Sequence, residues 1–324
     1  MEEGVTVFTP TYNRAYRLPA LYQSLCGQTC QKFEWLIVDD GSTDDTKSLV
    51  KHWLDEHKIG IRYYSQENSG KAQAHNRGVE LARMRLFTCV DSDDILVSNA
   101  IERILAMWDE YPDKIGIICA RMGMDHRPTT YWKGKVQYCT LYNAYRKYGL
   151  RGEAMLIYQS NIIKKYQFPK FEGEKFIRES YLYDLLDQEG VMYITREALY
   201  ISEYLPDGYT RNSHRLVQEN RRGYQAYLIQ RLKLDKKLRY KAVDTLEYIL
   251  NKQAMKDGRL IDDSVYPILT GMLYIVVCLY DKIKNVAVLQ PVFDGLRKRM
   301  SIGYIPLRDR HIQKKMKAEG ADCS

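Results

Sequence analysis

The first 120 residues alternate between two hydrophobic patterns. Short runs of apolar residues predict strands, and longer segments with apolar residues at three- and four-residue spacing predict helices. Because strands that alternate with helices form βαβ units, we expect a parallel sheet with right-handed crossovers. The expected strands are 5–9, 34–38, 61–64, 86–90 and 115–119, and the expected helices are 17–25, 46–54, 72–82 and 99–107.

Beyond residue 120 the hydrophobic pattern changes twice. It weakens over 125–149, where tyrosines and basic residues dominate, and it then predicts a second mixed region and a helical end. We therefore expect two domains, 1–210 and 211–324. The mixed region has expected strands at 154–158, 191–194 and 198–204 and an expected helix at 180–188, and the later expected helices lie near 214–233, 236–255, 265–284 and 288–299.

Charge is distributed unevenly along the chain. The net charge of the 324 residues is +8. The part from residue 211 onward contains 23 Lys and Arg against 12 Asp and Glu, a net charge of +11, which leaves −3 for residues 1–210. Such a basic region suits an anionic partner, for example a membrane surface, a phosphorylated acceptor or nucleic acid. A set of solvated helix faces explains the same charge equally well.

Composition narrows the class of protein. Hydrophobic residues make up 45% of the chain, which is enough for a folded core. Seven cysteines without a Cys-x-x-Cys pair argue against structural zinc and a disulfide framework, and they favour a reducing cytoplasm. The longest apolar stretch, 265–280, has 16 residues, fewer than the roughly 20 that a membrane-spanning helix needs. The chain runs from Met-Glu-Glu directly into an expected strand, so we expect no signal peptide.

Polar residues follow four of the expected strands. Because ligands of open α/β sheets bind outside the carboxyl ends of the strands, we expect these residues to form one site. The first strand is followed by Thr-Pro-Thr-Tyr-Asn-Arg (9–14), the second by Asp-Asp-Gly-Ser (39–42), the third by Asn-Ser-Gly-Lys (68–71) and the fourth by Asp-Ser-Asp-Asp (91–94).

The acidic turn at residues 91–94 brings three carboxylates together. Their mutual repulsion is costly unless a cation or strong hydrogen-bond donors offset it. Hard oxygen ligands suit Mg²⁺ or Mn²⁺, which keep coordination positions open for substrate phosphates. An acidic turn that caps the helix near Asn99 is the simpler alternative, but the polar residues at the other strand ends favour a metal site.

The second and third strand ends suit a nucleotide. A buried carboxylate at 39–40 could accept the N–H of a pyrimidine ring, and Tyr12 could stack on the base. Lys71 and His75 lie at i and i+4 on a helix that opens after Gly70, and a helix start with a cation is a ready anion site. A simple turn, ordinary packing and an exposed surface pair remain as alternatives. The sequence has no Gly-x4-Gly-Lys-Ser/Thr loop and no Gly-x-Gly-x-x-Gly, so a dinucleotide fold has no support.

These strand ends resemble the motifs of family 2 glycosyltransferases with the GT-A fold. The resemblance rests on residues 9–13, 38–44, 68–78 and 90–94, which occur in the family's order and spacing across 4–120. It weakens over 150–210 and is not evident after 211. It implies an α/β fold, with a Rossmann-like, mostly parallel central sheet and flanking helices, followed here by a helical C-terminal region.

The resemblance also implies an activity. It points to an inverting, metal-dependent hexosyltransferase that moves a sugar from a nucleotide donor, usually UDP-linked, to an acceptor hydroxyl, commonly in bacterial polysaccharide or surface-glycan synthesis. Carried over by position, Pro10, Tyr12 and Asp40 would hold the base. Asp91 would contact the ribose or the donor sugar, and Asp93 would bind, together with Asp91, the Mn²⁺ or Mg²⁺ that bridges the diphosphate.

The remaining donor-site positions implied by the resemblance are Asn68, Lys71, His75, Asn76 and Ser92. One of them departs from the family pattern. An Arg commonly precedes the Asn of the third motif, and His75 stands there in this chain. The expected phosphate contact is thereby weakened, and Lys71 is expected to compensate.

Direct displacement at the anomeric carbon needs a base near the acceptor hydroxyl. Glu179 precedes an expected helix and matches the acidic position where the family places its base, although Ser180 replaces the usual following Asp. Asp184 is the reserve candidate. A first-turn carboxylate stabilised by the helix dipole is the structural alternative for Glu179. His214 follows a segment, 203–210, that resembles the donor-closing loop of relatives, and it is a candidate further metal ligand.

Apolar and basic residues alternate again near the C-terminus, over 293–315. This region could dock on anionic lipid near a lipid-linked acceptor, pack on the catalytic domain or form a homodimer. We therefore expect a UDP-sugar donor, a glycan or lipid-linked acceptor and no nucleic acid, in the cytoplasm or peripherally at the inner face of the cell membrane.

Two other functions compete with a glycosyltransferase. A nucleotidylyltransferase would want a Gly-rich activation loop near the N-terminus, which residues 9–14 lack. A catalytically inactive sugar-nucleotide-binding protein would not need the acidic cluster and Glu179, which speak against it. The sugar, the acceptor and the linkage depend on pocket shape in the weakly patterned region 121–180.

Overall fold

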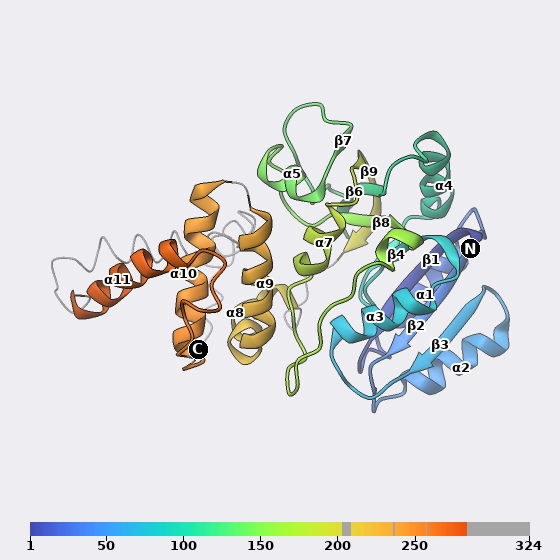
Figure 1. Ribbon diagram of the computed structural model, residues 1–324. Coiled ribbons are helices and arrows are strands. Elements are labelled where there is room, and N and C mark those ends of the chain that lie inside the picture. Colours follow the sequence, from blue (N-terminus) through green and yellow to red (C-terminus); the bar gives the residue numbers. More distant parts are fainter. Residues whose placement is uncertain (203–208, 236, 257, 284–324) are drawn as a thin grey trace. The chain divides into compact units, whose positions relative to one another are not determined.

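A single mixed sheet organises the N-terminal part of the chain in this computed structural model (Figure 1). The structure describes residues 1–202, 209–235, 237–256 and 258–283. Within these residues the sheet has nine strands in the order β3-β2-β1-β4-β8-β6-β9-β5, and β7 pairs with β9. The chain divides into two units, residues 1–223 and the part from Tyr224 onward. The division falls after the residue 210 boundary suggested by the change in charge.

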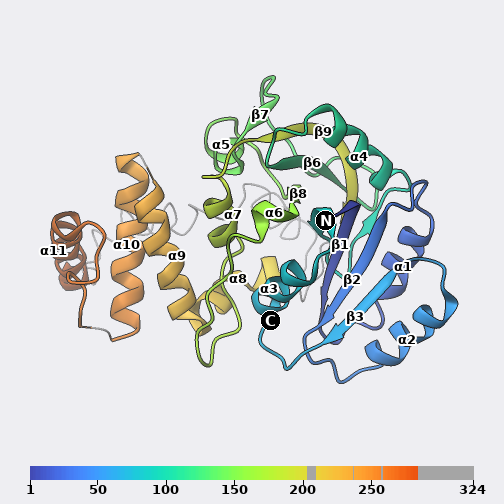
Figure 2. The same ribbon diagram turned by 45° about the vertical axis from the view of Figure 1, so that its right-hand side comes forward.

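The first half of the sheet is parallel, as the sequence predicts. β1 pairs with β2 on one side and with β4 on the other, and β2 pairs with β3. Helices α1, α2 and α3 connect these strands and lie beside them in both views (Figures 1 and 2). The elements are β1 (Glu2–Thr11), α1 (Leu18–Cys26), β2 (Phe33–Asp39), α2 (Thr46–Glu56), β3 (Ile61–Ser65), α3 (Lys71–Leu81) and β4 (Met84–Cys89).

The second half of the sheet departs from the expected parallel arrangement. β8 (Met155–Gln159) lies between β4 and β6 (Gly116–Gly123) and is antiparallel to both. The sheet is therefore mixed, because a strand later in the chain separates the fourth and fifth expected strands. Two expected strands, 191–194 and 198–204, form one strand, β9 (Met192–Ser202), which bulges in its pairing with β6.

Short elements of this half gave no clear sequence pattern. Strands of two residues are too short to show alternation, and α5 and α6 have fewer than two helical turns. The remaining elements are β5 (Ile95–Leu96), α4 (Ala100–Glu110), β7 (Tyr138–Cys139), α5 (Leu141–Arg146), α6 (Ser160–Ile163) and α7 (Ser180–Leu186).

Hydrophobic clusters cover both faces of the sheet. Because side chains alternate along a strand, Val7 of β1 joins one cluster and Phe8 joins the other. The first cluster contains stacked rings of Tyr22, Trp35 and Trp53. Full burial of an apolar side chain such as Val7 or Phe8 stabilises the fold by roughly 1.5–3 kcal/mol, so both clusters help to hold the strands in place.

The chain after β9 is helical where the structure describes it. One helix was expected over 214–233, but α8 (Tyr209–Glu219) and α9 (Arg221–Leu234) break at Asn220. The later helices are α10 (Leu238–Ala254) and α11 (Pro267–Ile283). The expected helix 288–299 and the segment 203–208 lie outside the described residues. Among the described helices, none has the combined length and apolar character of a membrane span.

Candidate functional site

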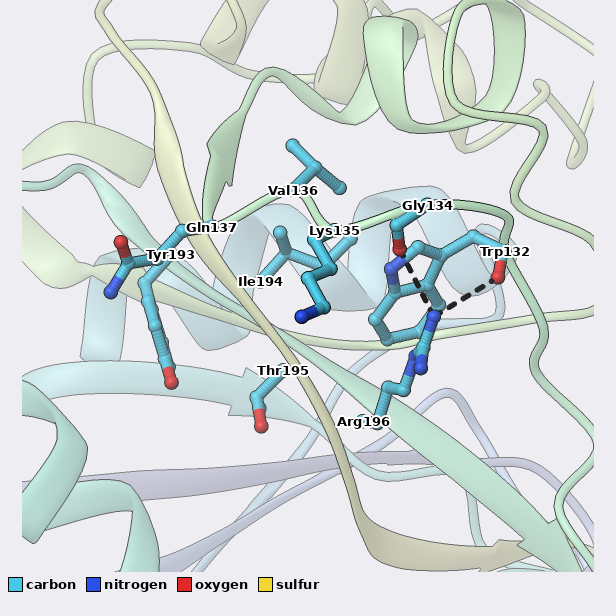
Figure 3. Close-up of a pocket in the computed structure, with 9 residues that line it drawn as sticks. All are labelled: Trp132, Gly134, Lys135, Val136, Gln137, Tyr193, Ile194, Thr195 and Arg196. Atoms are coloured by element: carbon cyan, nitrogen blue, oxygen red, sulfur yellow. Dashed lines mark hydrogen bonds between the residues drawn. The ribbon is translucent and has the colours of Figure 1, made fainter.

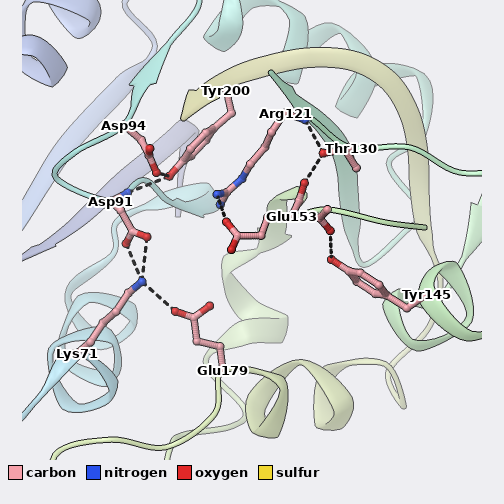
Figure 4. Close-up of polar contacts among 10 residues, drawn as sticks. Lys71, Asp91, Asp94, Arg121, Thr130, Tyr145, Glu153, Glu179 and Tyr200 are labelled. Carbon is pink, nitrogen blue, oxygen red and sulfur yellow. Dashed lines mark hydrogen bonds and ion pairs between the residues drawn. The ribbon is translucent and has the colours of Figure 1, made fainter. Parts of the chain in front are cut away.

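Three segments distant in sequence meet at one cation (Figure 4). Lys71 opens α3, and its Nζ lies 2.8 Å from Oδ1 and 3.0 Å from Oδ2 of Asp91, the first residue of the acidic turn after β4. The same Nζ lies 2.8 Å from Oε1 of Glu179, which immediately precedes α7. A candidate base and a candidate donor-binding carboxylate therefore share one ammonium group.

Electrostatics in this cluster favour the charged forms of Lys71 and Asp91. Burial alone would lower the pKa of Lys71, but the carboxylates of Asp91 and Glu179 raise it well above its usual value. Burial would likewise raise the pKa of Asp91, but Lys71 and then Arg121 hold it below its usual range. The charges of the two residues are thus mutually stabilised, while Glu179 remains accessible, with 52% of its side chain exposed.

Among the described residues, no cationic side chain forms an ion pair with the Asp93 carboxylate of the acidic turn. Burial and the neighbouring charge of Asp91 raise its pKa. Within the part of the chain that the structure describes, no other residue donates a hydrogen bond to its carboxylate. A divalent cation fits this observation, because it would offset both effects with the hard oxygen ligands that Mg²⁺ and Mn²⁺ prefer.

The described residues alone do not build a complete metal cage. No three His, Cys, Asp or Glu side chains among them converge closely enough to hold an ion. Mg²⁺ sites commonly use one or two carboxylates together with substrate phosphates, so Asp91 and Asp93 match that donor set. His214 is exposed on α8, and among the described contacts none joins it to the acidic turn.

Tyr200, near the end of β9, fixes the conformation of the acidic turn (Figure 4). Its hydroxyl accepts a hydrogen bond from the Asp91 N–H at 3.1 Å and donates one to Asp94 Oδ2 at 2.6 Å. Burial raises the pKa of Asp94 to about 7. One buried hydroxyl therefore orders both ends of the turn.

Arg121 of β6 packs against Tyr200, the residue that orders the acidic turn. Its guanidinium stacks on the Tyr200 ring, 4.0 Å from the ring centroid, and pairs with Glu153 at 2.9 Å. Burial opposes its charge, but Tyr200, Glu153 and Asp94 raise its pKa well above the usual value. Sequence reasoning missed Arg121, Glu153 and Tyr200, because each is an isolated residue of a strand or loop that only the mixed sheet brings to the turn.

Asp40, at the end of β2, organises the neighbouring loop. Its carboxylate accepts hydrogen bonds from Gln66 Nε2 at 2.8 Å, from the Ser69 N–H at 3.0 Å and from the Gly70 N–H at 2.7 Å. Asp40 itself is almost fully buried. The carboxylate thus joins the loop after β3 to the end of β2, and it lies at the sheet edge where the sequence placed it.

The other expected base-binding residues lie at the same end of β1 and β2. Pro10 is buried within β1 and faces Val38 in the register of the parallel pair. Tyr12 follows β1 directly and is 49% exposed, so its ring is accessible to a planar ligand. Asn68 is half-buried, and its backbone packs against Gly41. Ser92 is buried within the acidic turn.

Gly70 occupies a position that other residues would not tolerate. Its φ of +90° lies in the region that favours glycine. A Cβ at this position would meet the Lys175 carbonyl oxygen at 1.9 Å. The segment before Glu179 therefore passes directly over the start of α3, which explains why Lys71 and Glu179 are neighbours.

The segment before Glu179 is also tied to the α8–α9 junction. Asn220 Oδ1 accepts hydrogen bonds from the backbone N–H groups of Lys175 and Phe176, at 2.8 and 3.0 Å. Glu174 accepts from the N–H groups at the start of α9, those of Arg222 and Gly223, both at 2.8 Å. These contacts hold the approach to Glu179 in one conformation.

His75 and Asn76 of α3 have structural partners. The His75 ring is only 6% exposed and packs edge to face against Phe8, Phe87 and Phe168. Burial lowers its pKa to about 4. Asn76 Nδ2 donates to the Phe168 carbonyl, and its Oδ1 accepts from the Phe168 N–H. Both residues therefore join α3 to the segment that leads toward Glu179.

Asp184, the reserve candidate for the base, lies in another environment. It acts electrostatically on Asp187 and Tyr158. Asp187 in turn accepts the N–H groups of Leu141 and Tyr142 at the start of α5. Among the described contacts, Glu179 and not Asp184 is paired with the Lys71–Asp91 cluster.

The N-terminal half of the chain is similar to known glycosyltransferases. Residues 6–166, just under half of the chain, match the family model described as glycosyl transferase family 2. Glycosyltransferase GlyG of Streptococcus pneumoniae is 37% identical over 111 residues, which are 34% of this chain and 36% of that protein. The Escherichia coli chondroitin synthase is 34% identical over 115 residues, 36% of this chain and 16% of the relative. The matches thus span a minor part of these relatives.

Solved structures share the fold. The S. aureus TarS 1-349 complex with UDP-GlcNAc has a TM-score of 0.58 at 18% identity, and the match covers 82% of this chain and 77% of that one. The mannosyltransferase PcManGT from Pyrobaculum calidifontis, in complex with GDP-Man and Mn²⁺, has a TM-score of 0.52 at 18% identity, covering 86% and 81%. The expected α/β fold of the GT-A kind with a helical C-terminal region is confirmed.

Proposed function

We propose that this chain is an inverting, metal-dependent glycosyltransferase that moves a hexose from a UDP-sugar to an acceptor hydroxyl. The observation that carries the proposal is the shared contact of Lys71 with Asp91 and Glu179. It combines a carboxylate of a candidate cation site with an exposed carboxylate that can act as a base. The matching family model and the fold shared with nucleotide-sugar complexes support this chemistry.

The donor is proposed to bind at the ends of β1, β2 and β4. Tyr12 offers an exposed ring for the base, and Asp40 keeps the loop after β3 in place beside it. Asp91 and Asp93 would hold Mg²⁺ or Mn²⁺ against the diphosphate. When bound, the ion would supply positive charge to the leaving UDP. Lys71 lies beside Asp91 and adds a second positive charge in that region.

Glu179 is proposed as the general base. In a single displacement its carboxylate would take the proton of the acceptor hydroxyl, and the acceptor oxygen would bond to C1 as the C1–O bond to UDP breaks. Attack from the face opposite UDP inverts the anomeric configuration. The Lys71 ammonium lies 2.8 Å from Glu179 Oε1 and so orients the carboxylate. The Gly70–Lys175 contact and the Asn220 hydrogen bonds keep the segment before Glu179 in position.

His75 is assigned an indirect role in this account. Its low pKa keeps the ring neutral near pH 7, so it would not offer a cation to the diphosphate. Asn76 and His75 instead hold α3 against the segment around Phe168. The phosphate contact expected from the family pattern is therefore assigned to Lys71.

The acceptor is proposed to be a bacterial polysaccharide or another surface glycan. This part rests on the kinds of relatives that match. α11 presents apolar side chains to solvent, and a membrane or dimer contact through the C-terminal region remains our expectation for them. They are Ile268, Met272, Ile275, Val276 and Leu279.

Release of UDP tests the proposal. The full chain is incubated with Mn²⁺ and a panel of UDP-sugars, with and without glycan acceptors, and UDP is measured. We expect release from at least one donor, and we expect EDTA to abolish it. Absence of both binding and release for every donor would overturn the proposal. Release of pyrophosphate from UTP and a sugar phosphate would indicate a nucleotidylyltransferase instead.

A further inference from the structure

A hollow lies between the loop before β7 and the start of β9 (Figure 3). Its volume is about 490 Å³. The proposed donor-site residues are not part of its wall. Its wall combines two cations, Lys135 and Arg196, with two aromatic rings, Trp132 and Tyr193. Such a wall favours a ligand that carries negative charge and also has rings that can pack against the two aromatic side chains.

The cations of the hollow are available for a ligand. In the part of the chain that the structure describes, neither Lys135 nor Arg196 is paired with a carboxylate. Arg196 Nη2 donates to the carbonyl oxygens of Gly134 at 3.1 Å and Trp132 at 3.4 Å, so its guanidinium is held in place. Figure 3 shows Lys135 between Tyr193 and the Trp132–Arg196 pair.

The surrounding sequence strengthens the positive charge. No Asp or Glu occurs between Asp125 and Glu153, whereas six Lys and Arg do. These basic residues are Arg127, Lys133, Lys135, Arg146, Lys147 and Arg151. Of these six residues, Lys135 is in the wall of the hollow, and the positive net charge of the segment favours an anionic partner.

The aromatic rings of the hollow are preorganised. Tyr193 stacks on Tyr111 with ring centroids 4.2 Å apart and an interplanar angle of 20°. Trp132 carries the Arg196 guanidinium 5.4 Å from its ring centroid. Rigid aromatic rings provide apolar contact area at a low cost in conformational entropy. They suit the C–H faces of pyranose rings, while the two cations suit carboxylate or phosphate groups on those rings.

A bulge in β9 links this hollow to the acidic turn. β6 residues Cys119 and Arg121 pair with Thr195 and Tyr200, so two steps along β6 correspond to five along β9. The extra residues include Arg196, and bulges commonly redirect a side chain beside a functional site. The hollow therefore begins only a few strand positions from Tyr200, which orders the acidic turn.

We propose that the hollow binds an anionic saccharide segment of the acceptor, with Lys135 and Arg196 contacting its carboxylate or phosphate groups and Trp132 and Tyr193 contacting its rings. The assignment to an acceptor rests on the proposed glycosyltransferase function. A nucleic acid would need a longer row of phosphate contacts than the two cations of the hollow provide.

Saccharide binding without a donor tests this proposal. Tetragalacturonate, its neutral methyl ester and an oligomer of glycerol phosphate are titrated separately into the full chain. We expect binding of an anionic probe and none of the ester. Binding of the galacturonate would indicate carboxylate recognition, and binding of the glycerol phosphate oligomer would indicate phosphate recognition. Equal binding of acid and ester, or no binding of either anion, would overturn the proposal.

Variants locate the binding in the hollow. Lys135 is exposed and its replacement should not disturb folding, so Lys135→Gln is expected to weaken binding about fivefold. Adding Arg196→Gln should weaken it more than about tenfold, because a charge-assisted hydrogen bond is lost as well. The control Lys47→Gln/Lys51→Gln removes two exposed charges of α2 and should bind like the unmodified chain.

The variants also define the results that would overturn the proposal. An unchanged affinity in Lys135→Gln and in the double variant would contradict the proposal. So would tighter binding of single-stranded oligonucleotide or of vesicles with anionic headgroups that is lost in the same variants. Titration of the unmodified chain with UDP and Mn²⁺ separates this proposal from the proposed glycosyltransferase function. Saccharide binding without any UDP binding would refute the glycosyltransferase and leave the anion site standing.

Discussion

Lys71 and Glu179 form an ion pair with an Nζ–Oε1 distance of 2.8 Å, and the same Nζ contacts Asp91. The pair exists because the backbone around Lys175 crosses over Gly70, the residue immediately before α3. One cation thus couples the side of the site assigned to the donor with the side assigned to the acceptor. Its removal should disturb both, and its effect on the base is open to measurement.

Replacement of Lys71 by Met is expected to shift the pH dependence of the reaction. Lys71 holds the pKa of Asp91 below its usual range, so loss of the ammonium group favours protonation of the Asp91 carboxylate. The acidic limb of the pH–rate profile should therefore move to higher pH, and kcat near neutral pH should fall by about tenfold or more. Lys71→Arg keeps the charge and should retain the original profile. An unshifted profile in Lys71→Met would show that Lys71 does not control the ionisation of Asp91.

Replacement of Asp93 by Asn should weaken metal-dependent donor binding. The pKa of Asp93 is raised by burial and by Asp91, and a cation would relieve that cost. Calorimetric titration with UDP and Mn²⁺ should show a loss of at least about tenfold, since even residues outside the metal's direct ligands cost 10–100-fold when changed. Exposed Asp55 of α2 provides the control Asp55→Asn. Equal affinities in both variants would remove Asp93 from the proposed metal site.

The His75 ring should stay neutral well below pH 7. Burial lowers its pKa to about 4, so protonation of the folded protein begins only when the pH falls toward that value. Nuclear magnetic resonance of labelled histidine should show a titration midpoint near 4, with His52 on the exposed face of α2 as an internal comparison. A midpoint at or above 6.5 for His75 would instead support the cationic phosphate contact that the sequence suggested.

Asp187 should make stability depend on pH. Burial raises its pKa from 3.8 to about 7, so the folded protein keeps a proton that the unfolded chain releases. Stability contributed by this group is therefore lost as pH rises from about 4 to about 7, at up to about 1.4 kcal/mol per pH unit. Denaturant unfolding of Asp187→Asn should lack that slope. Parallel curves for the two proteins would contradict the assignment.

The parallel half of the sheet was predictable, and the other half was not. Each strand from β1 to β3 is followed by its helix and then by the next strand of the sheet, so local periodicity determines the βαβ order. β8 pairs with β4 and β6 across long loops, and nothing local in 154–158 encodes that insertion. The single strand β9 was divided in the prediction because its bulge at Arg196 and Glu197 interrupts the apolar pattern.

Prediction of the candidate site from the sequence is limited in the same way. Sequence motifs predict the residues at the ends of β1, β2 and β4, and the structure brings Lys71, Asp91 and Glu179 together. The motifs do not reveal that Tyr200 orders the acidic turn or that Arg121 stacks on the Tyr200 ring. They also do not distinguish a ligand-contacting His75 from one buried among phenylalanines. Such distinctions depend on long-range packing.

The base assignment is the central claim, and Glu179→Gln tests it most directly. The variant keeps the size of the side chain and removes its ability to take a proton. With Mn²⁺ and an accepted UDP-sugar, we expect the affinity for the donor to remain within a few-fold and the rate of sugar transfer to fall by roughly 10²–10⁴-fold. Asp184→Asn serves as the control and should transfer at the normal rate. Transfer by Glu179→Gln at the normal rate would contradict the account.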